Sequence, residues 1–306
     1  MSSSPVVEVS GIRKTYGSTV AVDDVSFAVR EGEIFGLIGP NGAGKTTTME
    51  CVEGLRHPDA GSIGVFGLDP IKDARALQTR IGVQFQQAEL QKRIKVREAV
   101  ELWASLYDTP VDAHRLLDQL GLTEKRDAWF MTLSGGQKQR LFIALALIND
   151  PELVFLDELT TGLDPQARRA IWELVRDIKD RGKTVFLTTH IMEEAERLCD
   201  RVAIIEHGRI VDHDTPAGLI ERHCPQRRIV VATDHPDAAG AFRRLAPVDE
   251  VSTDGEALTV IGRGDDLVTA VIHAISEHRM QVTAFRTELP TLEDVFLTLT
   301  GHSIRD

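Results

Sequence analysis

One loop of this chain reads Gly39-Pro40-Asn41-Gly42-Ala43-Gly44-Lys45-Thr46, which fits the spacing G-x-x-x-x-G-K-[ST]. The apolar run 34–38 before it predicts a strand buried on both faces, and the residues after it predict a helix through Leu55. A phosphate-binding loop of this type joins a strand to a helix. A glycine-rich turn that precedes a lysine by chance would not be expected between such elements. The loop therefore predicts an α/β P-loop fold that binds a nucleoside triphosphate.

The residue types of this loop suit phosphate chemistry. Its glycines let successive backbone N–H groups point at the β- and γ-phosphates, and the N-terminus of the following helix adds partial positive charge. We expect the ammonium of Lys45 to reach the terminal phosphates and the hydroxyl of Thr46 to be a ligand for Mg²⁺. The predicted nucleotide-binding residues of the loop are Gly39, Pro40, Asn41, Gly42, Ala43, Gly44, Lys45, Thr46 and Thr47.

A second element places two carboxylates at the end of an apolar strand. The run Leu153-Val154-Phe155-Leu156 leads directly into Asp157 and Glu158. Parallel sheets bind ligands at the carboxyl ends of their strands, so this run would deliver both acids to the ligand edge. We expect Asp157 to hold Mg²⁺ through its water shell and Glu158 to orient or deprotonate the attacking water. Taken alone, the two acids could equally end a strand in solvent.

The composition limits the classes of protein to which this chain can belong. Its 306 residues suggest one large domain and a smaller one, and 42% hydrophobic residues suffice for a sizeable core. A formal net charge of −12 argues against a non-specific nucleic-acid binder and against a basic patch resting on anionic lipid. The widely spaced Cys51, Cys199 and Cys224 are expected to be reduced thiols. Without a run of about 18 apolar residues or a visible signal peptide, we expect a soluble, cytoplasmic chain.

The pattern along the chain predicts two domains. We expect a nucleotide-binding domain at residues 1–220, with a helical insertion at about 87–147 where helical spacing replaces strand patterns. A linker is expected at residues 212–225, which are rich in turn formers and charge. The small α+β domain, residues 226–306, reads as strand, helix, strand, strand, helix, strand, the order of ferredoxin-like folds. A last helix is expected at residues 292–300.

Strands and helices alternate in the first domain, which predicts a mostly parallel sheet. A strand at residues 6–10 is expected to lead into a loop through Lys14, Tyr16 and Gly17. Further strands are expected at residues 20–29, 34–38, 153–156, 184–188 and 201–206. Helices are expected at residues 96–106, 113–120, 166–181 and 192–199.

A third stretch distinguishes among the families of P-loop proteins. It reads Leu133-Ser134-Gly135-Gly136-Gln137, and it lies before a predicted helix and between the P-loop and the two carboxylates. Here the chain resembles the ABC-type ATPases, whose signature sequence it matches letter for letter. The resemblance implies the ABC type of the P-loop fold, ATP as the nucleotide, and a homodimer that forms on ATP binding. It also implies contacts to the γ-phosphate held by the partner subunit from Ser134, Gly135, Gly136 and Gln137.

The resemblance assigns three further residues, one position at a time. Tyr16 matches the aromatic residue that stacks on adenine, although it could be an ordinary loop aromatic. Asp164, in Gly162-Leu163-Asp164-Pro165, matches the residue that contacts the other subunit's P-loop. His190 matches the histidine that senses the γ-phosphate.

A glutamine and a departure from the family pattern complete the predicted site. Gln86 matches the glutamine that contacts Mg²⁺ and the attacking water and that opens the segment facing the membrane partner, but Gln84 and Gln87 leave a shift of register open. Leu159 stands where the family usually has proline, which could change the rigidity of the turn after Glu158. The implied catalytic residues are Lys45, Gln86, Glu158 and His190, and the implied Mg²⁺ ligands are Thr46, Gln86 and Asp157.

The end of the chain carries a weaker resemblance. Leu292-Glu293-Asp294-Val295-Phe296, with Leu299-Thr300-Gly301, resembles the ending of ATPase subunits from bacterial exporters of drugs, antibiotics, lipids or polysaccharides, including the daunorubicin-resistance (ABC-2) type. The segment could also be a simple amphipathic helix that packs on the small domain. The resemblance implies an exporter subunit held at the cytoplasmic face of the membrane by a separate integral-membrane permease, with no nucleic-acid partner.

Two other functions remain as alternatives. An importer's ATPase subunit is disfavoured by the α+β tail, because importer chains often carry a longer β-rich domain or none. A soluble ABC-type ATPase that acts on ribosomes or DNA is disfavoured by the single P-loop, the single signature, the absence of zinc-ligand spacing and the acidic composition.

Overall fold

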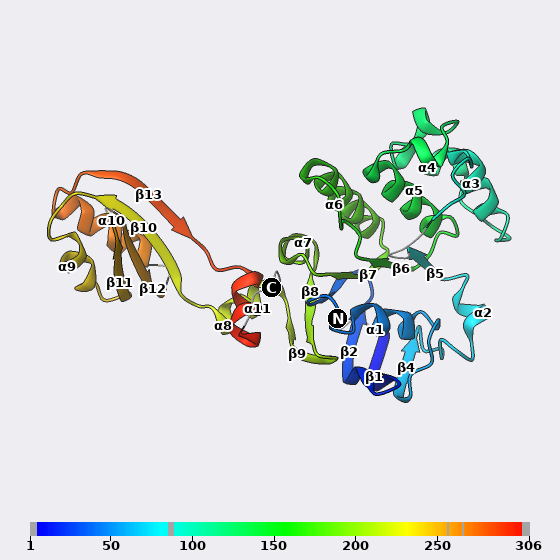
Figure 1. The fold of residues 1–306 in the computed structure, drawn as a ribbon, viewed down its shortest axis with the longest axis horizontal. Coiled ribbons are helices and arrows are strands. Elements are labelled where there is room, and N and C mark those ends of the chain that lie inside the picture. Colours follow the sequence, from blue (N-terminus) through cyan, green and yellow to red (C-terminus); the bar gives the residue numbers. More distant parts are fainter. Residues whose placement is uncertain (1–4, 85–88, 256, 265, 302–306) are drawn as a thin grey trace. The chain divides into compact units, whose positions relative to one another are not determined.

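The computed structural model describes residues 5–84, 89–255, 257–264 and 266–301. The chain divides into two compact units, one ending at Pro216 and the other beginning at Ala217 (Figure 1). No helix within these described ranges is long and apolar enough to cross a bilayer.

A six-stranded sheet forms the middle of the first unit. Its strands are β3 (Ile34–Ile38), β5 (Ile81–Gln84), β6 (Leu153–Asp157), β7 (Thr184–Thr189), β8 (Arg201–Glu206) and β9 (Arg209–Asp214). They lie in the order β5-β6-β7-β3-β8-β9, with β9 antiparallel to β8 and every other pair parallel. The strands β3, β6 and β7 are buried along their whole lengths, as strands covered on both faces must be. The predicted, mostly parallel sheet is confirmed.

A three-stranded antiparallel sheet covers one face of this sheet. It consists of β1 (Pro5–Tyr16), β2 (Thr19–Arg30) and β4 (Ala60–Val65), in the order β2-β1-β4. The prediction of a loop after residue 10 is wrong, because β1 continues to Tyr16. Irregularities between Val9 and Ile12 and around Lys14 shift the register without ending the ladder, as β-bulges do. The bulge at Gly11 has a φ of 58°, which glycine adopts without strain.

The core of the first unit lies between these two sheets. Phe27 of β2 stacks on Phe35 of β3 with 5.2 Å between ring centroids, and Phe186 of β7 meets both rings edge-on. Helix α1 (Lys45–Val52) contributes its buried face to the same cluster through Met49 and Val52. The loop that precedes α1 is therefore anchored on both sides by core packing.

Helices cover the opposite face of the six-stranded sheet (Figure 1). Helices fall within residues 89–147, the stretch in which a helical insertion is expected. The helices of the first unit other than α1 are α2 (Ala74–Leu77), α3 (Val96–Ala104), α4 (Ala113–Gln119), α5 (Gly135–Leu147), α6 (Pro165–Asp180) and α7 (Met192–Leu198). Short 3₁₀ turns at Thr123–Lys125 and Phe130–Thr132 precede α5.

The second unit contains the predicted ferredoxin-like arrangement. Its elements are β10 (Arg227–Thr233), α9 (Ala238–Arg243), β11 (Val248–Asp254), β12 (Ala257–Gly262), α10 (Leu267–Glu277) and β13 (Val282–Glu288). The strands form an antiparallel sheet in the order β11-β12-β10-β13, which is the split β-α-β topology. Its own core includes Phe242, Val260 and Val271.

The boundary between the two units falls within the predicted linker at residues 212–225, but this segment has regular structure. The segment holds the end of β9 and a further helix, α8 (Pro216–His223), and proline suits the first position of a helix because its missing N–H has no partner there. The last helix, α11 (Leu292–Thr300), is confirmed at both ends. Thr291 caps its N-terminus, and its apolar residues Leu292, Val295 and Phe296 are buried, as in an amphipathic helix.

Candidate functional site

The glycine-rich loop joins β3 to α1, as predicted, and two of its glycines are required by close backbone contacts. A Cβ atom on Gly39 would lie 2.1 Å from the carbonyl oxygen of Ile205. Gly44 has a φ of 102°, and a Cβ atom there would lie 2.3 Å from the carbonyl oxygen of Ala21. The loop therefore runs against neighbouring backbone in a path that side chains would block, which fixes its curvature.

Lys45 lies at the centre of this loop. Its side chain is 3% exposed, and its ammonium donates to the carbonyl oxygens of Gly39 and Pro40, each at 2.9 Å. The ammonium also lies 3.6 Å from Oε1 of Glu158. Burial lowers the pKa of Lys45, and the neighbouring Glu158 carboxylate acts in the opposite direction. The cation is thus held in place by the loop that would carry the phosphates.

Asp157 ends β6 among hydroxyl groups. Its Oδ1 accepts from Thr46 Oγ1 at 3.5 Å and from the hydroxyl of Thr188, the residue opposite it in the ladder with β7. Burial raises the pKa of Asp157, while the hydrogen bonds from Thr188 and Thr46 oppose the shift. A carboxylate beside a threonine hydroxyl is the hard-oxygen donor set that Mg²⁺ prefers, so Thr46 and Asp157 fit the predicted metal. We did not predict a role for Thr188. Its position near the carboxyl end of the strand beside β6 is the feature that could have indicated one.

Glu158 is brought together with two other predicted residues. Its φ of 46° lies in the left-handed region, which turns the chain at the end of β6. Its Oε1 lies 3.4 Å from Nδ1 of His190, in addition to the contact with Lys45, and its side chain is 7% exposed. Strained backbone of this kind clusters at functional sites. The site therefore gathers a carboxylate, an imidazole and an ammonium from three segments of the chain.

The signature stretch forms the start of α5. The Ser134 hydroxyl accepts from the backbone N–H of Gln137 at 3.3 Å, and the Gln137 side chain accepts from the Ser134 N–H at 3.0 Å. This reciprocal capping box starts a 13-residue helix, whose N-terminus carries partial positive charge. Among the described residues, no hydrogen bond or ion pair joins residues 134–137 to residues 39–47. The signature does not contribute to the P-loop of its own chain in this structure.

Asp164 lies beside the signature and not beside the P-loop. It caps α6 by accepting from the backbone N–H groups of Gln166 at 3.0 Å and Ala167 at 2.9 Å. A Cβ atom on Gly135 would lie 3.2 Å from the Leu163 side chain, so the loop before Asp164 packs on the signature turn. Both candidate contacts to a partner subunit are therefore presented by adjoining segments.

The other positions singled out in the sequence are Tyr16, the glutamines at 84, 86 and 87, and Leu159. Tyr16 ends β1 with 41% of its surface exposed, and the Arg56 guanidinium lies 5.5 Å from its ring centroid. Gln86 and Gln87 lie outside the described residues, while Gln84 ends β5 and is buried. The side chain of Leu159 is buried and packs within the fold at the position where proline was expected.

A family model described as ABC transporter matches residues 22–161. The chain is 40% identical to the Nod factor export ATP-binding protein I of Ralstonia nicotianae, over 99% of this chain and 96% of that protein. The chain belongs to the ABC transporter family.

Solved structures agree with this assignment and with ATPase activity. The ATP-binding subunit of an ABC transporter superposes with a TM-score of 0.64 at 30% identity, over 71% of this ABC subunit and 92% of that chain. The dimeric bacterial ABC transporter cassette MJ0796 gives a TM-score of 0.62 at 26% identity, over 68% of this chain and 98% of that one. The predicted family, fold class and ATP-binding function are confirmed.

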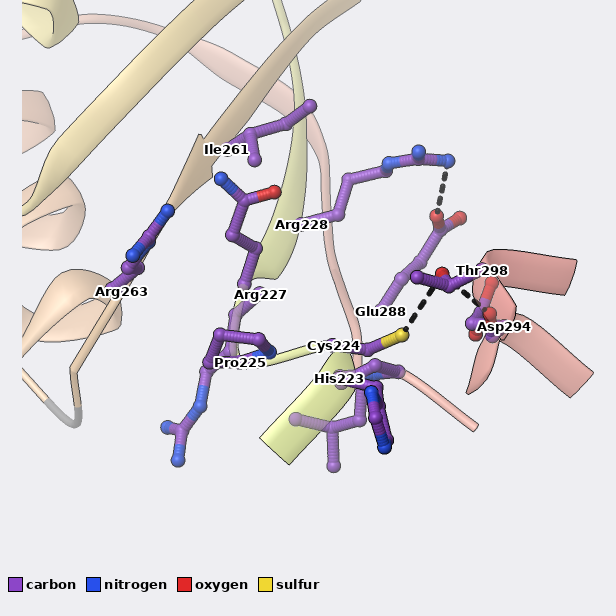
Figure 2. A pocket seen from close by; sticks show the side chains of 13 residues that line it. His223, Cys224, Pro225, Arg227, Arg228, Ile261, Arg263, Glu288, Asp294 and Thr298 are labelled. Carbon is purple, nitrogen blue, oxygen red and sulfur yellow. Dashed lines mark hydrogen bonds and ion pairs between the residues drawn. The ribbon is translucent and has the colours of Figure 1, made fainter. Parts of the chain in front are cut away.

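The second unit of this ABC subunit holds a hollow of about 520 Å³ (Figure 2). Side chains around the end of α8, the start of β10, the end of β13 and α11 line it. Two of its arginines are already paired, Arg228 with Glu288 at 3.7 Å and Arg263 with Asp249 at 3.1 Å. The Cys224 thiol lies 3.5 Å from the hydroxyl of Thr298. Because these groups already have partners within the second unit, we assign no ligand to the hollow.

A smaller hollow of about 200 Å³ in the first unit encloses a carboxyl group that the sequence did not single out. Glu53 follows α1 directly and shares the hollow with the apolar side chains of Val83, Trp103, Tyr107 and Leu145. Burial raises the pKa of Glu53 to about 8, and the charges of Asp157 and Glu50 add to the shift. The folded ABC subunit therefore favours the neutral form of this group.

Replacing Glu53 with Gln is expected to stabilise the subunit in alkaline solution. Between the usual pKa of 4.5 and the folded value of about 8, the folded state keeps a proton that the unfolded state has lost, so rising pH destabilises the parent. The difference in Tm between the variant and the parent should grow between these two pH values and level off above the higher one. It should reach about 5 °C. Thermal unfolding at about pH 5 and about pH 9 checks this, with Glu101→Gln on the exposed face of α3 as the control. An advantage that is equal at both pH values would contradict the assignment.

Proposed function

We propose that this chain is the ATP-binding and ATP-hydrolysing subunit of an ABC exporter. In this proposal it is held at the cytoplasmic face of the membrane by a separate permease. The convergence of Lys45, Glu158 and His190 on one point beside the P-loop carries the hydrolytic part of the proposal. We assign this chemistry to the unit that ends at Pro216, close to the predicted domain boundary at residue 220. The predicted small domain, residues 226–306, lies within the second unit, which begins at Ala217.

The buried Glu158 carboxylate supports a role on the attacking water. It is positioned as the proton acceptor, with the His190 imidazole 3.4 Å away to fix its orientation and to contact the γ-phosphate. Lys45 supplies fixed positive charge where negative charge develops on the transferred phosphoryl group. Thr46 and Asp157, with Gln86, would hold Mg²⁺, which neutralises phosphate charge when it is bound. The half-exposed ring of Tyr16 offers a surface on which adenine would stack.

We further propose that two copies form the complete enzyme. In this arrangement the N–H groups and side chains of residues 134–137 reach the γ-phosphate held by the partner, and Asp164 reaches the partner's P-loop. The capped helix start at Ser134 supports this, because the N-terminus of a helix binds anions. A dimeric cassette among the similar structures also supports it.

Export is favoured over import by the relatives. The match to a Nod factor export ATP-binding protein covers 99% of this chain and therefore runs through both units, whereas the ATP-binding subunit of known structure covers 71% of it. The negative net charge disfavours the alternative of an ATPase that acts on ribosomes or DNA. The transported molecule would be selected by the permease.

Purification of the tagged chain from detergent-solubilised membranes tests this proposal. We expect a polytopic membrane protein of about six spanning helices to copurify in a stoichiometric amount, because a chain that drives export must be joined to a membrane-spanning partner. The variant Lys72→Ala, which removes a surface ammonium paired with Asp69, should copurify the same protein. Recovery of ribosomal proteins or DNA in place of a membrane protein would favour the second alternative.

A further inference from the structure

The loop after Glu158 is fastened to the helix after His190 by a buried carboxyl group. Oε1 of Glu194, on α7, accepts from the hydroxyl of Thr160 at 2.7 Å, and both side chains are fully enclosed. The indole N–H of Trp172, on α6, donates to the same oxygen at 2.9 Å. No ion pair to Glu194 occurs among the described residues, so these two donors are its stabilising partners.

The contact between Thr160 and Glu194 lies within the loop that carries Glu158 and Asp164, so it bears on the active site as well as on the fold. Thr160 lies two residues after Glu158 and four before Asp164, and its carbonyl accepts from the Leu163 N–H at 3.2 Å. The loop of residues 158–164 therefore begins with the carboxylate of Glu158, beside the nucleotide site of this chain. It ends with the carboxylate of Asp164, beside the signature. Thr160 is the fixed point between the two.

The same two segments meet twice. Glu158 contacts His190 at 3.4 Å in the active site, and Thr160 contacts Glu194 at 2.7 Å. Leu159 lies between the two tie points and has no ring to restrict its φ, so the loop lacks the stiffness that proline would give it. The hydrogen bond from Thr160 is then one restraint on this loop, and it is the one that joins the loop to α7.

We propose that Glu194 is a positioning residue for ATP hydrolysis: through Thr160 it holds the loop from Glu158 to Asp164 against the helix that follows His190. The inference rests on the proposed role of Glu158 at the attacking water. The hydrogen bond of Trp172 has a different role, because its indole N–H joins Glu194 to α6, whereas the hydroxyl of Thr160 joins Glu194 to the loop.

Two variants of the full-length chain remove one donor each from the same oxygen. Thr160→Val keeps the shape of the side chain and loses the hydroxyl, and Trp172→Phe keeps an aromatic ring and loses the indole N–H. We expect Thr160→Val to lower kcat about tenfold with KM for ATP unchanged, because small displacements of reacting groups are costly while the P-loop is untouched. Trp172→Phe should keep the parent kcat at temperatures where it is folded. Thr160→Ser, which restores the hydroxyl, should recover most of the rate.

Two results would overturn the inference. One is a parent value of kcat in Thr160→Val. The other is an equal loss of kcat in Thr160→Val and Trp172→Phe that follows their loss of Tm, which would indicate a purely structural role. Failure of the proposed function is distinguishable, because it would appear as parent turnover in Glu158→Gln whatever the Thr160 variants do.

Discussion

The variant Glu158→Gln is expected to lose ATP turnover by a factor of about a hundred to ten thousand, the usual contribution of a positioned proton acceptor. The amide has nearly the shape of the carboxylate, but it cannot take a proton from water. Lys45 and the loop carbonyls that hold it remain in place, so ATP should still bind. Bound ATP that is not hydrolysed should accumulate in a closed pair of subunits.

Steady-state phosphate release and size-exclusion chromatography with and without ATP measure both effects. Glu152→Gln is the matched control, because Glu152 lies just before β6 as Glu158 lies just after it, and it pairs with Arg80 on the surface. The control should hydrolyse ATP at the parent rate and remain monomeric after turnover. If Glu158→Gln also turned over at the parent rate, the assigned role of this carboxylate would be wrong.

The variant Lys45→Ala is expected to fail one step earlier, at nucleotide binding. Its ammonium lies 3.6 Å from the buried carboxylate of Glu158, so truncation also removes positive charge that balances this carboxylate. We expect the affinity for ATP to fall on the order of a hundredfold, as charge-assisted contacts to phosphate are lost. Titration with a fluorescent ATP analogue checks this.

A comparison of the two variants separates binding from chemistry. Glu158→Gln should hold ATP with the parent affinity and Lys45→Ala should not, so only the first should form an ATP-dependent dimer. Lys72→Ala provides the control for loss of a lysine, because its ammonium pairs with Asp69 at the surface. Parent affinity in Lys45→Ala would contradict the placement of the phosphates in this loop.

The parts of the site that could be predicted from the sequence are those defined by neighbours in the chain. The P-loop and the signature are continuous stretches in which each residue's task depends on the residues beside it. The contacts of Thr188 with Asp157 and of Thr160 with Glu194 join residues 31 and 34 positions apart. A local sequence pattern cannot predict such pairs, because they depend on how strands and helices that are distant in the sequence pack together.

The errors in the predicted fold have similar causes. Strand β1 was cut short because its bulges interrupt the alternation of apolar and polar residues on which the prediction depends. Strand β9 lies at the edge of its sheet and alternates between exposed and half-buried residues, so it resembled a polar linker. Glu53 was missed because its neighbours in the hollow come from β5, α3 and α5, which are distant in sequence.

The self-contained cap at Ser134 has a genetic consequence. A serine hydroxyl that accepts from its own helix still has its proton to donate, so the signature is complete whether or not the P-loop of the same chain works. In a pair that exchanges these parts, a chain with a ruined P-loop and a chain with a ruined signature would together rebuild one intact site. Damaging alleles of this subunit would then fall into two groups, and members of different groups would complement one another in the same cell.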